Sequence, residues 1–446
     1  MTATTAEPLR LTERLSYGMG DVAFSLPYNM ASAFLLYYYV NVAHLPAAGV
    51  GTIFLTARLL DAVIDLLVGV AIDRTDTRWG RTRPYFLFTA VPYAVLFVAL
   101  FMVPAGSEFV RLAYAFLTFK ALGIIMSLGS IPYTALMPMM TPRPDDRIRL
   151  SGMRSVGTSV SVVLGTAATM PLVGLFGGGN EQRGFQAVAV LFAGISLVAV
   201  FALFRNCKER VSFVGAPKAA IGPVVRAMVR NKAWLVSFAF CLVYFIRFGA
   251  MMATTPYFAI DVLHRPWMIS IMLPAVAGML LLSSFVAPSV FRRLGLRRGC
   301  VTVLLLAAAL FLVLPMLEAS PPAFIACYLG AMLASSITIT AAYNMVADAV
   351  DYHEWRFGTR NEGILSAGVS LATKVGMAIG SASIAFLLAA VAYRAEAVTP
   401  GAAAAIRWFY YAGTAVLLAV QAGVAWSWPM DGLHATIRAD IAARAA

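Results

Sequence analysis

Charged residues are scarce in this sequence, and cysteines are scarcer. Only 12% of the 446 residues are Asp, Glu, Lys or Arg, whereas 61% are hydrophobic. A water-soluble domain of this size could not cover such a surface with polar groups. The four cysteines show no close pairing, which excludes a disulfide framework and is typical of small buried side chains. The N-terminal region lacks a short apolar core followed by a cleavage site, so we expect the first membrane span itself to direct insertion.

Several motifs are also absent. Period-two alternation of polar and apolar residues over about ten positions is missing, which argues against a transmembrane barrel. The glycine-rich stretch at 177–180 lacks the Lys-Ser/Thr of a phosphate-binding loop, which argues against an ATP-driven pump. The four histidines form no metal-ligand set. We therefore expect neither an enzyme nor a protein with a bound cofactor other than a transported ion.

Long apolar runs are what the sequence has in abundance. Runs of about 18 residues or more are long enough to cross a bilayer, where helices satisfy the backbone without water. The pattern predicts an all-α membrane protein with twelve transmembrane helices in two six-helix bundles. The predicted spans cover residues 15–43, 48–72, 84–104, 111–139, 150–175, 184–205, 233–261, 267–291, 299–317, 321–349, 363–391 and 403–428.

The net charge of +13 is explained by topology. The even-numbered gaps between spans hold 20 Lys and Arg residues, whereas the odd-numbered gaps hold four, Arg111, Arg183, Arg265 and Arg394. By the positive-inside rule, the even-numbered gaps and both termini are cytoplasmic. The chain is thus expected to be a multi-pass protein of the bacterial inner membrane, with membrane lipid and no nucleic acid as a partner.

A basic gap divides the chain into two halves. We expect an N-terminal bundle at 1–205, a cytoplasmic linker at 206–232, and a C-terminal bundle with a short tail at 233–446. A weak repeat supports the division, because GVAIDRTDTRWGRTRP follows span 2 and APSVFRRLGLRRG follows span 8. Two parallel six-helix halves are a common transporter architecture, with the substrate site between them near the midplane. We expect a monomer.

Several blocks resemble one transporter family. GVAIDRTDTRWGRTRPYFLF is similar to the loop motif of the major facilitator superfamily, in the form used by the glycoside–pentoside–hexuronide:cation symporters. LSYGMGD, ARLLDAVID, SIPYTALMP and MVADAVDYHEWRFGTRNEGILSAGVSLATKVGMAIG resemble the same family, and together the blocks run from residue 15 to residue 380. The resemblance implies the major facilitator fold and secondary active transport of sugars or uronides with Na⁺ or H⁺.

Arg58, Asp61 and Asp65 lie on one face of an otherwise apolar helix because they are spaced by three and then four. Two carboxylates one turn apart repel each other until a cation or a shared proton binds. The resemblance places the family's cation-binding aspartates at the same two positions. We therefore predict a cation-coupling site at Asp61 and Asp65, with Na⁺ as a candidate metal ion. The alternative is a static ion pair with Arg58.

The fourth span supplies the remaining predicted coupling residues, Ser127 and Ser130. The resemblance places a third family acid at Ser130, and an Asn of the family falls at Ile64. Loss of a formal charge weakens a site for a hard cation. Both departures favour H⁺, or a modified Na⁺ site.

The predicted substrate residues follow in part from the resemblance. A sugar-binding aspartate of the family falls at Ser25 and a stacking tryptophan at Thr134, while Asp21 lies one turn before Ser25 and could partly replace the lost acid or act as a gate partner. Arg154 and Lys374 match basic residues of the family.

Arg247 lies in the middle of an apolar span, where a charge facing lipid is costly. Together with Arg154 and Lys374 it could bind a carboxylate or sulfonate on the solute. The alternative is pairing between helices, of Arg154 with Asp21 and of Lys374 with Asp61 or Asp65. Lys120, in the outer half of span 4, is expected to extend its ammonium toward the membrane surface.

Charges at the cytoplasmic ends of spans are predicted to latch the two halves together and to release on switching. The alternative is anchoring by arginine alone. The predicted latch residues are Arg58, Asp73, Arg74, Arg81, Asp351, Glu354 and Arg360.

These observations predict a symporter that moves a glycoside or an acidic sugar with H⁺ or Na⁺ by alternating access. A lysolipid or amphiphile symporter of the same fold remains an alternative, because sugar-type carboxylates are fewer here than in the family. An uncoupled sugar facilitator is the other alternative.

Overall fold

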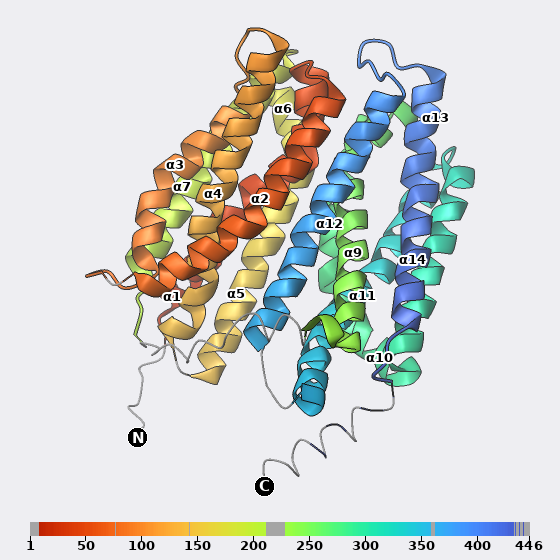
Figure 1. Cartoon of the computed structure of the whole chain (residues 1–446). Coiled ribbons are helices and arrows are strands. Elements are labelled where there is room, and N and C mark those ends of the chain that lie inside the picture. Colours follow the sequence, from red (N-terminus) through yellow and green to blue (C-terminus); the bar gives the residue numbers. More distant parts are fainter. Residues whose placement is uncertain are drawn as a thin grey trace. The chain divides into compact units, whose positions relative to one another are not determined.

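The computed structural model describes residues 9–431 except 76, 142, 211–227 and 358–361, together with 433, 437 and 440. All regular elements in this part of the chain are helices (Figure 1). The chain divides into two compact units, Met1–Ala216 and Pro217–Ala446. The division falls within the predicted linker at 206–232, most of which lies outside the described residues.

The first unit is built around α1, which packs against α5 and α7, while α2 packs against α4 and α3 against α4 and α7. Its helices are α1 (Leu11–Tyr37), η1 (Tyr38–Val42), α2 (Ala47–Arg74), α3 (Arg83–Leu100), α4 (Glu108–Met140), α5 (Pro144–Val162), η2 (Val163–Ala167), α6 (Thr169–Gly177) and α7 (Glu181–Asn206).

The second unit is built around α9, which packs against α12, α14 and α11, while α10 packs against α11 and α14. Its helices are α9 (Lys232–Tyr257), η3 (Phe258–Val262), η4 (Pro266–Met268), α10 (Ile269–Val313), η5 (Leu314–Leu317), α11 (Pro321–Phe357), α12 (Glu362–Ala390), α13 (Pro400–Trp408), η6 (Phe409–Gly413) and α14 (Thr414–Trp426).

The predicted membrane fold is confirmed. Each of the twelve predicted spans coincides with a helix or with a run of consecutive helices. Within the described residues, eight helices are long and apolar enough to cross a membrane, and the bent pair Arg149–Ala167 and Thr169–Gly177 makes a ninth. The spans predicted at 267–291 and 299–317 are two helices within α10 that meet at a kink at Gly295, whose φ of 75° is not helical.

Polar caps set several helix starts. The side chains of Ser107, Asn180, Asn231 and Thr399 each accept a hydrogen bond from the backbone N–H three residues later. This contact satisfies one of the donors that the first turn of a helix leaves unpaired. All four cysteines are free thiols, as the sequence predicted.

The first helix of each unit ends in the same way, which reveals a second internal repeat. YYVNVAHLP at 38–46 and FAIDVLHRP at 258–266 each form a π-helical turn and then a histidine with positive φ, His44 at 49° and His264 at 54°. The backbone bonds also match, since the N–H groups of Leu45 and Arg265 donate six residues back. Non-glycine residues seldom adopt this conformation, so its recurrence marks corresponding positions in the two units.

Glycines let the first helix of each unit approach a neighbour closely. A Cβ on Gly157 of α5 would lie 2.3 Å from the carbonyl oxygen of Gly18 on α1. In the second unit, a Cβ on Gly380 of α12 would lie 2.1 Å from the carbonyl oxygen of Ile246 on α9. Small residues at such crossings are the usual means of close packing between membrane helices.

Candidate functional site

The two aspartates of α2 each contact a polar side chain of α4. Lys120 Nζ donates to Asp61 Oδ1 at 2.5 Å, and Ser127 Oγ donates to Asp65 Oδ1 at 2.6 Å. Asp61 is buried, with 9% of its side chain exposed, and the Lys120 side chain is 12% exposed. Asp61 and Asp65 are one turn apart and therefore share one face of α2. Lys120 and Ser127 are two turns apart and likewise share one face of α4.

The structure corrects the expectation for Lys120. Its ammonium does not extend to the membrane surface but bonds Asp61, and it also donates to the backbone carbonyl oxygen of Ala57 at 3.2 Å. Gly123 makes room for this arrangement, because a Cβ there would lie 2.9 Å from Asp61 Oδ1. Because Asp61 is buried, loss of the ammonium would leave an uncompensated charge, which is strongly unfavourable.

The remaining predicted residues of this region are placed as follows. Ser130 is half-buried on α4, and its carbonyl oxygen accepts a hydrogen bond at 3.2 Å from the exposed hydroxyl of Thr134. The side chain of Arg58, which was predicted to pair with the aspartates, lies outside the described residues.

Asp21 is the centre of a second polar cluster, between α1 and α5. Its carboxylate accepts hydrogen bonds from Ser25 Oγ at 3.1 Å, Arg154 Nε at 3.2 Å and Thr158 Oγ1 at 2.7 Å. The Arg154 guanidinium also lies 5.2 Å from the ring centre of Tyr133. Arg154 and Asp21 therefore neutralise each other in this structure, which is the inter-helix pairing that the sequence offered as an alternative to anion binding.

Arg247 has a different environment. It lies on α9 with 3% of its surface exposed, and its Nη1 contacts Met251 Sδ at 3.8 Å. Its guanidinium lies 5.1 Å from the ring centre of Tyr244, and its Nε has no hydrogen-bond partner among the described residues. In that part of the chain the structure records no ion pair at Arg247. A buried cation without a carboxylate is rare, because burial removes its hydration.

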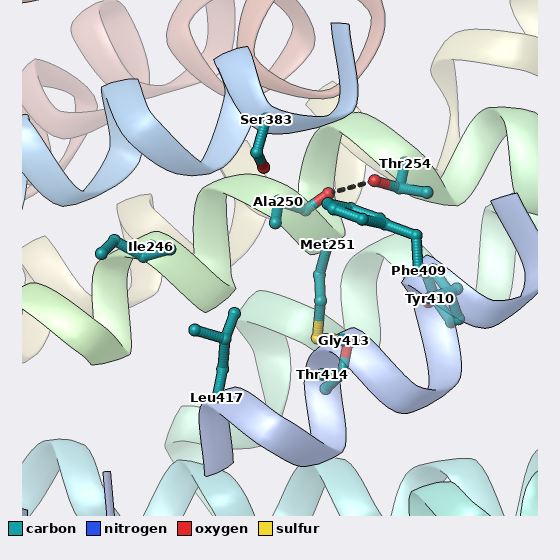
Figure 2. A pocket seen from close by; sticks show the side chains of 10 residues that line it. All are labelled: Ile246, Ala250, Met251, Thr254, Ser383, Phe409, Tyr410, Gly413, Thr414 and Leu417. Atoms are coloured by element: carbon teal, nitrogen blue, oxygen red, sulfur yellow. Dashed lines mark hydrogen bonds between the residues drawn. The ribbon is translucent and has the colours of Figure 1, made fainter. Parts of the chain in front are cut away.

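The second unit contains a cavity of about 230 Å³. Figure 2 shows residues that line it, among them Met251 and Thr254 of α9, Ser383 of α12 and Tyr410 of η6, with the Met251 side chain directed toward Gly413 and Thr414. Met251, which lines this cavity, also contacts Arg247 through its sulfur. Lys374, the other predicted base of this unit, is half-buried on α12.

Comparison with known proteins identifies the family. Residues 16–432 match the family described as MFS/sugar transport protein. The chain belongs to this family. It is therefore a membrane transporter of the major facilitator superfamily and not an enzyme.

Relatives and solved structures agree with this assignment. The chain is 34% identical to the isoprimeverose transporter of Lactiplantibacillus pentosus over 86% of this chain and 81% of the relative. It is 29% identical to the glucuronide carrier protein homolog of Escherichia coli K12 over 88% of this chain and 87% of the relative. In fold it is similar to a bacterial homolog of the lysosomal transporter Spinster, with a TM-score of 0.69, 16% identity and coverage of 95% and 96% of the two chains.

The latch residues predicted for this transporter are only partly described. Asp351 and Glu354 are half-buried on α11, and Arg81 lies in the loop between α2 and α3. Arg360 and the side chains of Asp73 and Arg74 lie outside the described residues.

One acid at this end of the first unit was missed in the sequence. The carboxylate of Glu209, just after α7, accepts hydrogen bonds from the backbone N–H of Arg81 at 3.0 Å and from the backbone N–H and hydroxyl of Thr82, both at 2.7 Å. Glu209 thus holds the α2–α3 loop of the transporter against the end of α7. No local pattern marks it, because its partners lie more than 120 residues away.

Two more missed acids join the helix starts of the first unit. Arg14 of α1 pairs with Asp146 of α5 at 3.1 Å, and Arg210 pairs with Glu13 of α1 at 2.5 Å. These ion pairs connect α1 to elements that are distant in sequence.

Proposed function

We propose that this transporter moves a glycoside or a uronide together with a cation, H⁺ or Na⁺, by alternating access. The observation that carries the proposal is the pair of aspartates on α2, each held by a side chain of α4 within the membrane. Ionisable groups inside a span are costly unless they pair or face water, and they commonly mark the path of an ion or a solute. The relatives named as an isoprimeverose transporter and a glucuronide carrier homolog support a sugar-type solute.

Asp61 and Asp65 are proposed to carry the coupled charge, with Ser127 and Ser130 as neighbouring hydroxyl ligands. Binding of a cation at this pair changes the local charge, and a binding-linked change of this kind couples ion affinity to solute affinity. Asp21, Ser25, Thr134 and Arg154 are proposed to bind the solute from the first unit.

Arg247 and Lys374 are proposed to favour an acidic solute. A buried guanidinium that has no carboxylate partner among the described residues can donate two parallel hydrogen bonds to a carboxylate or sulfonate of the solute. Glucuronides should then compete with transport better than the matching neutral glycosides. Equal competition by the two sugars, in the wild type and in R247Q, would remove this part of the proposal.

The transport proposal is tested by uptake into proteoliposomes. Radiolabelled methyl β-D-glucoside and methyl β-D-glucuronide are offered under a pH gradient, under a Na⁺ gradient, and with neither. Concentrative uptake is expected under at least one gradient. We expect D61N and D65N to exchange sugar without concentrating it, whereas T52A, at an exposed position of α2 outside the proposed sites, should still concentrate it. Full concentrative uptake by D61N and D65N would contradict the coupling role.

The cytoplasmic charges are proposed to act as a latch that breaks during the transport cycle. The residues concerned are Asp73, Arg74, Arg81, Asp351, Glu354 and Arg360, and Arg58, which lies inside α2 near the two aspartates, is proposed to switch with them. We also propose that the protein is a monomer in the bacterial inner membrane, with both termini in the cytoplasm.

A further inference from the structure

Lys120 occupies the place that a metal ion would need at Asp61. Its Nζ contacts a carboxylate oxygen of Asp61 at 2.5 Å and the backbone carbonyl oxygen of Ala57 at 3.2 Å. Carboxylate and carbonyl oxygens are the ligands that hard metal cations take in proteins. The ammonium therefore donates hydrogen bonds to oxygens that could otherwise bind Na⁺.

We infer that Lys120 is a tethered cation that excludes Na⁺ from this site and makes transport independent of Na⁺. The inference rests on the proposed coupling role of Asp61 and Asp65, because it concerns which ion that site can carry. It assigns Lys120 as a specificity residue for the coupled ion.

The charge of the site supports this role. In the described part of α2 and α4, the charged groups that face Asp61 are Lys120 and, one turn along, Asp65. Lys120 neutralises Asp61, while Asp65 accepts a hydrogen bond from the neutral hydroxyl of Ser127. Within the described residues there is no group of three or more His, Cys, Asp and Glu side chains that could surround a metal. A Na⁺ ion at Asp61 would thus lie next to a buried ammonium.

Burial makes the ammonium hard to displace. With 12% of the Lys120 side chain and 9% of the Asp61 side chain exposed, the pair lies in a medium where charges interact more strongly than in water. Na⁺ could replace the ammonium at Asp61 only by leaving a buried, unpaired lysine behind, which is strongly unfavourable. A proton, unlike Na⁺, can bind a carboxylate without a vacant metal site. Of the two candidate ions, H⁺ therefore fits this site better.

The test compares the wild type with K120Q and with the matched double variant D61N/K120Q. Thermal unfolding of the purified full chains is followed in NaCl and in choline chloride at equal ionic strength. A ligand that binds only the folded protein raises its melting temperature. We expect no Na⁺-specific shift for the wild type, a clear Na⁺-specific rise for K120Q, and loss of that rise in D61N/K120Q, which has no charge at position 61 to attract the ion.

Uptake in proteoliposomes provides the second measurement. Wild-type uptake of methyl β-D-glucoside or methyl β-D-glucuronide should respond to a pH gradient and not to a Na⁺ gradient. K120Q should become several-fold faster with Na⁺ outside. K120R, which keeps a tethered positive charge, should remain insensitive to Na⁺.

Two results would overturn the inference. One is a Na⁺-specific stabilisation of the wild type, or Na⁺-driven uptake by it, and this arm does not depend on any variant folding. The other is a folded K120Q that responds to Na⁺ in neither measurement. Failure of all chains to take up sugar would instead contradict the proposed transport, while the unfolding comparison would still decide the role of Lys120.

Discussion

At the scale of single residues, the partner decides what a charge in a membrane span can do. Asp21, Asp61 and Arg247 all lie in apolar helices, yet their surroundings differ. Asp21 has an arginine and two hydroxyls, Asp61 has an ammonium, and Arg247 has a thioether and an aromatic ring. The first two are neutralised within their unit, whereas Arg247 has no carboxylate among the described residues. The presence or absence of an oppositely charged partner therefore distinguishes a structural ion pair from a residue that could bind an acidic solute.

The Lys120–Asp61 pair should show strong coupling in a double-mutant cycle. Removing either partner leaves the other charge buried, which costs about 3–5 kcal/mol in the free energy of unfolding. D61N and K120Q should therefore each destabilise the protein more than D61N/K120Q does. Thermal unfolding in choline chloride measures the stability of the three variants.

R407Q is the control for loss of an exposed ion pair. Arg407 pairs with Glu318 at 2.8 Å while 40% of its side chain is exposed, and exposed pairs contribute about 1 kcal/mol or less. Additive effects of D61N and K120Q would contradict this view of the pair.

Glu209 should be needed to order the α2–α3 loop. E209A removes the acceptor of three hydrogen bonds and leaves the donors of buried Thr82 unpaired, at a cost of about 1–3 kcal/mol. Hydrogen exchange at residues 80–82 should become faster in E209A. E209Q keeps one acceptor oxygen and should show a smaller effect. Unchanged exchange in E209A would mean that the loop is held by other contacts.

At the scale of elements, glycines decide which helices can touch. α1 crosses α5 so closely at Gly18 and Gly157 that no side chain fits between the two backbones. This contact also brings Asp21 of α1 within reach of Arg154 and Thr158 of α5. The polar cluster therefore depends on the close packing of the two helices as well as on its own residues.

Replacing Gly157 should separate α1 from α5. In G157A the added Cβ would lie 2.3 Å from a backbone oxygen, so a helix must shift, and overpacking of this kind costs about 1–3 kcal/mol. We expect a lower melting temperature and reduced sugar uptake. G152A is the matched control, since Gly152 lies on the same helix and an added Cβ there meets nothing within 4 Å. Equal behaviour of the two variants would show that the crossing tolerates a methyl group.

At the scale of the whole molecule, the chain consists of two units that share a construction. Each contains a long helix, α1 or α9, that ends in a π-helical turn and a histidine with positive φ. Each also packs its first helix against a later helix through glycines. Structural repeats are typical of secondary transporters, where the two halves move against each other.

The orientation that we propose from the basic gaps can be measured directly. Fusions of green fluorescent protein to the C-terminus and to the linker at 206–232 should fluoresce, because that protein folds in the cytoplasm. Alkaline phosphatase, which is active only outside the cytoplasm, should be active when fused near residue 180 and inactive at the C-terminus. The reverse pattern would contradict the positive-inside assignment.

The sequence predicted the fold well and the site only in part. Apolar runs and basic gaps are local features, so the spans and their division into two halves could be read directly. Asp61 and Asp65 were recognised because two acids at helical spacing in an apolar run are unusual. Lys120 was misjudged because its partner lies 59 residues away on another helix, and periodicity within one helix does not tell which helix is adjacent.

The sequence by itself determined an all-helical membrane protein, its spans and the few charges they contain, because hydropathy and helical spacing act over short distances. The tertiary structure alone decided which charges meet. It placed an ammonium against Asp61, an arginine against Asp21, and none of the described carboxylates against Arg247. These pairings depend on how α2 meets α4 and how α1 meets α5, and such contacts arise from side-chain packing over the whole unit. The same packing therefore determines which charges remain available to an ion or a solute.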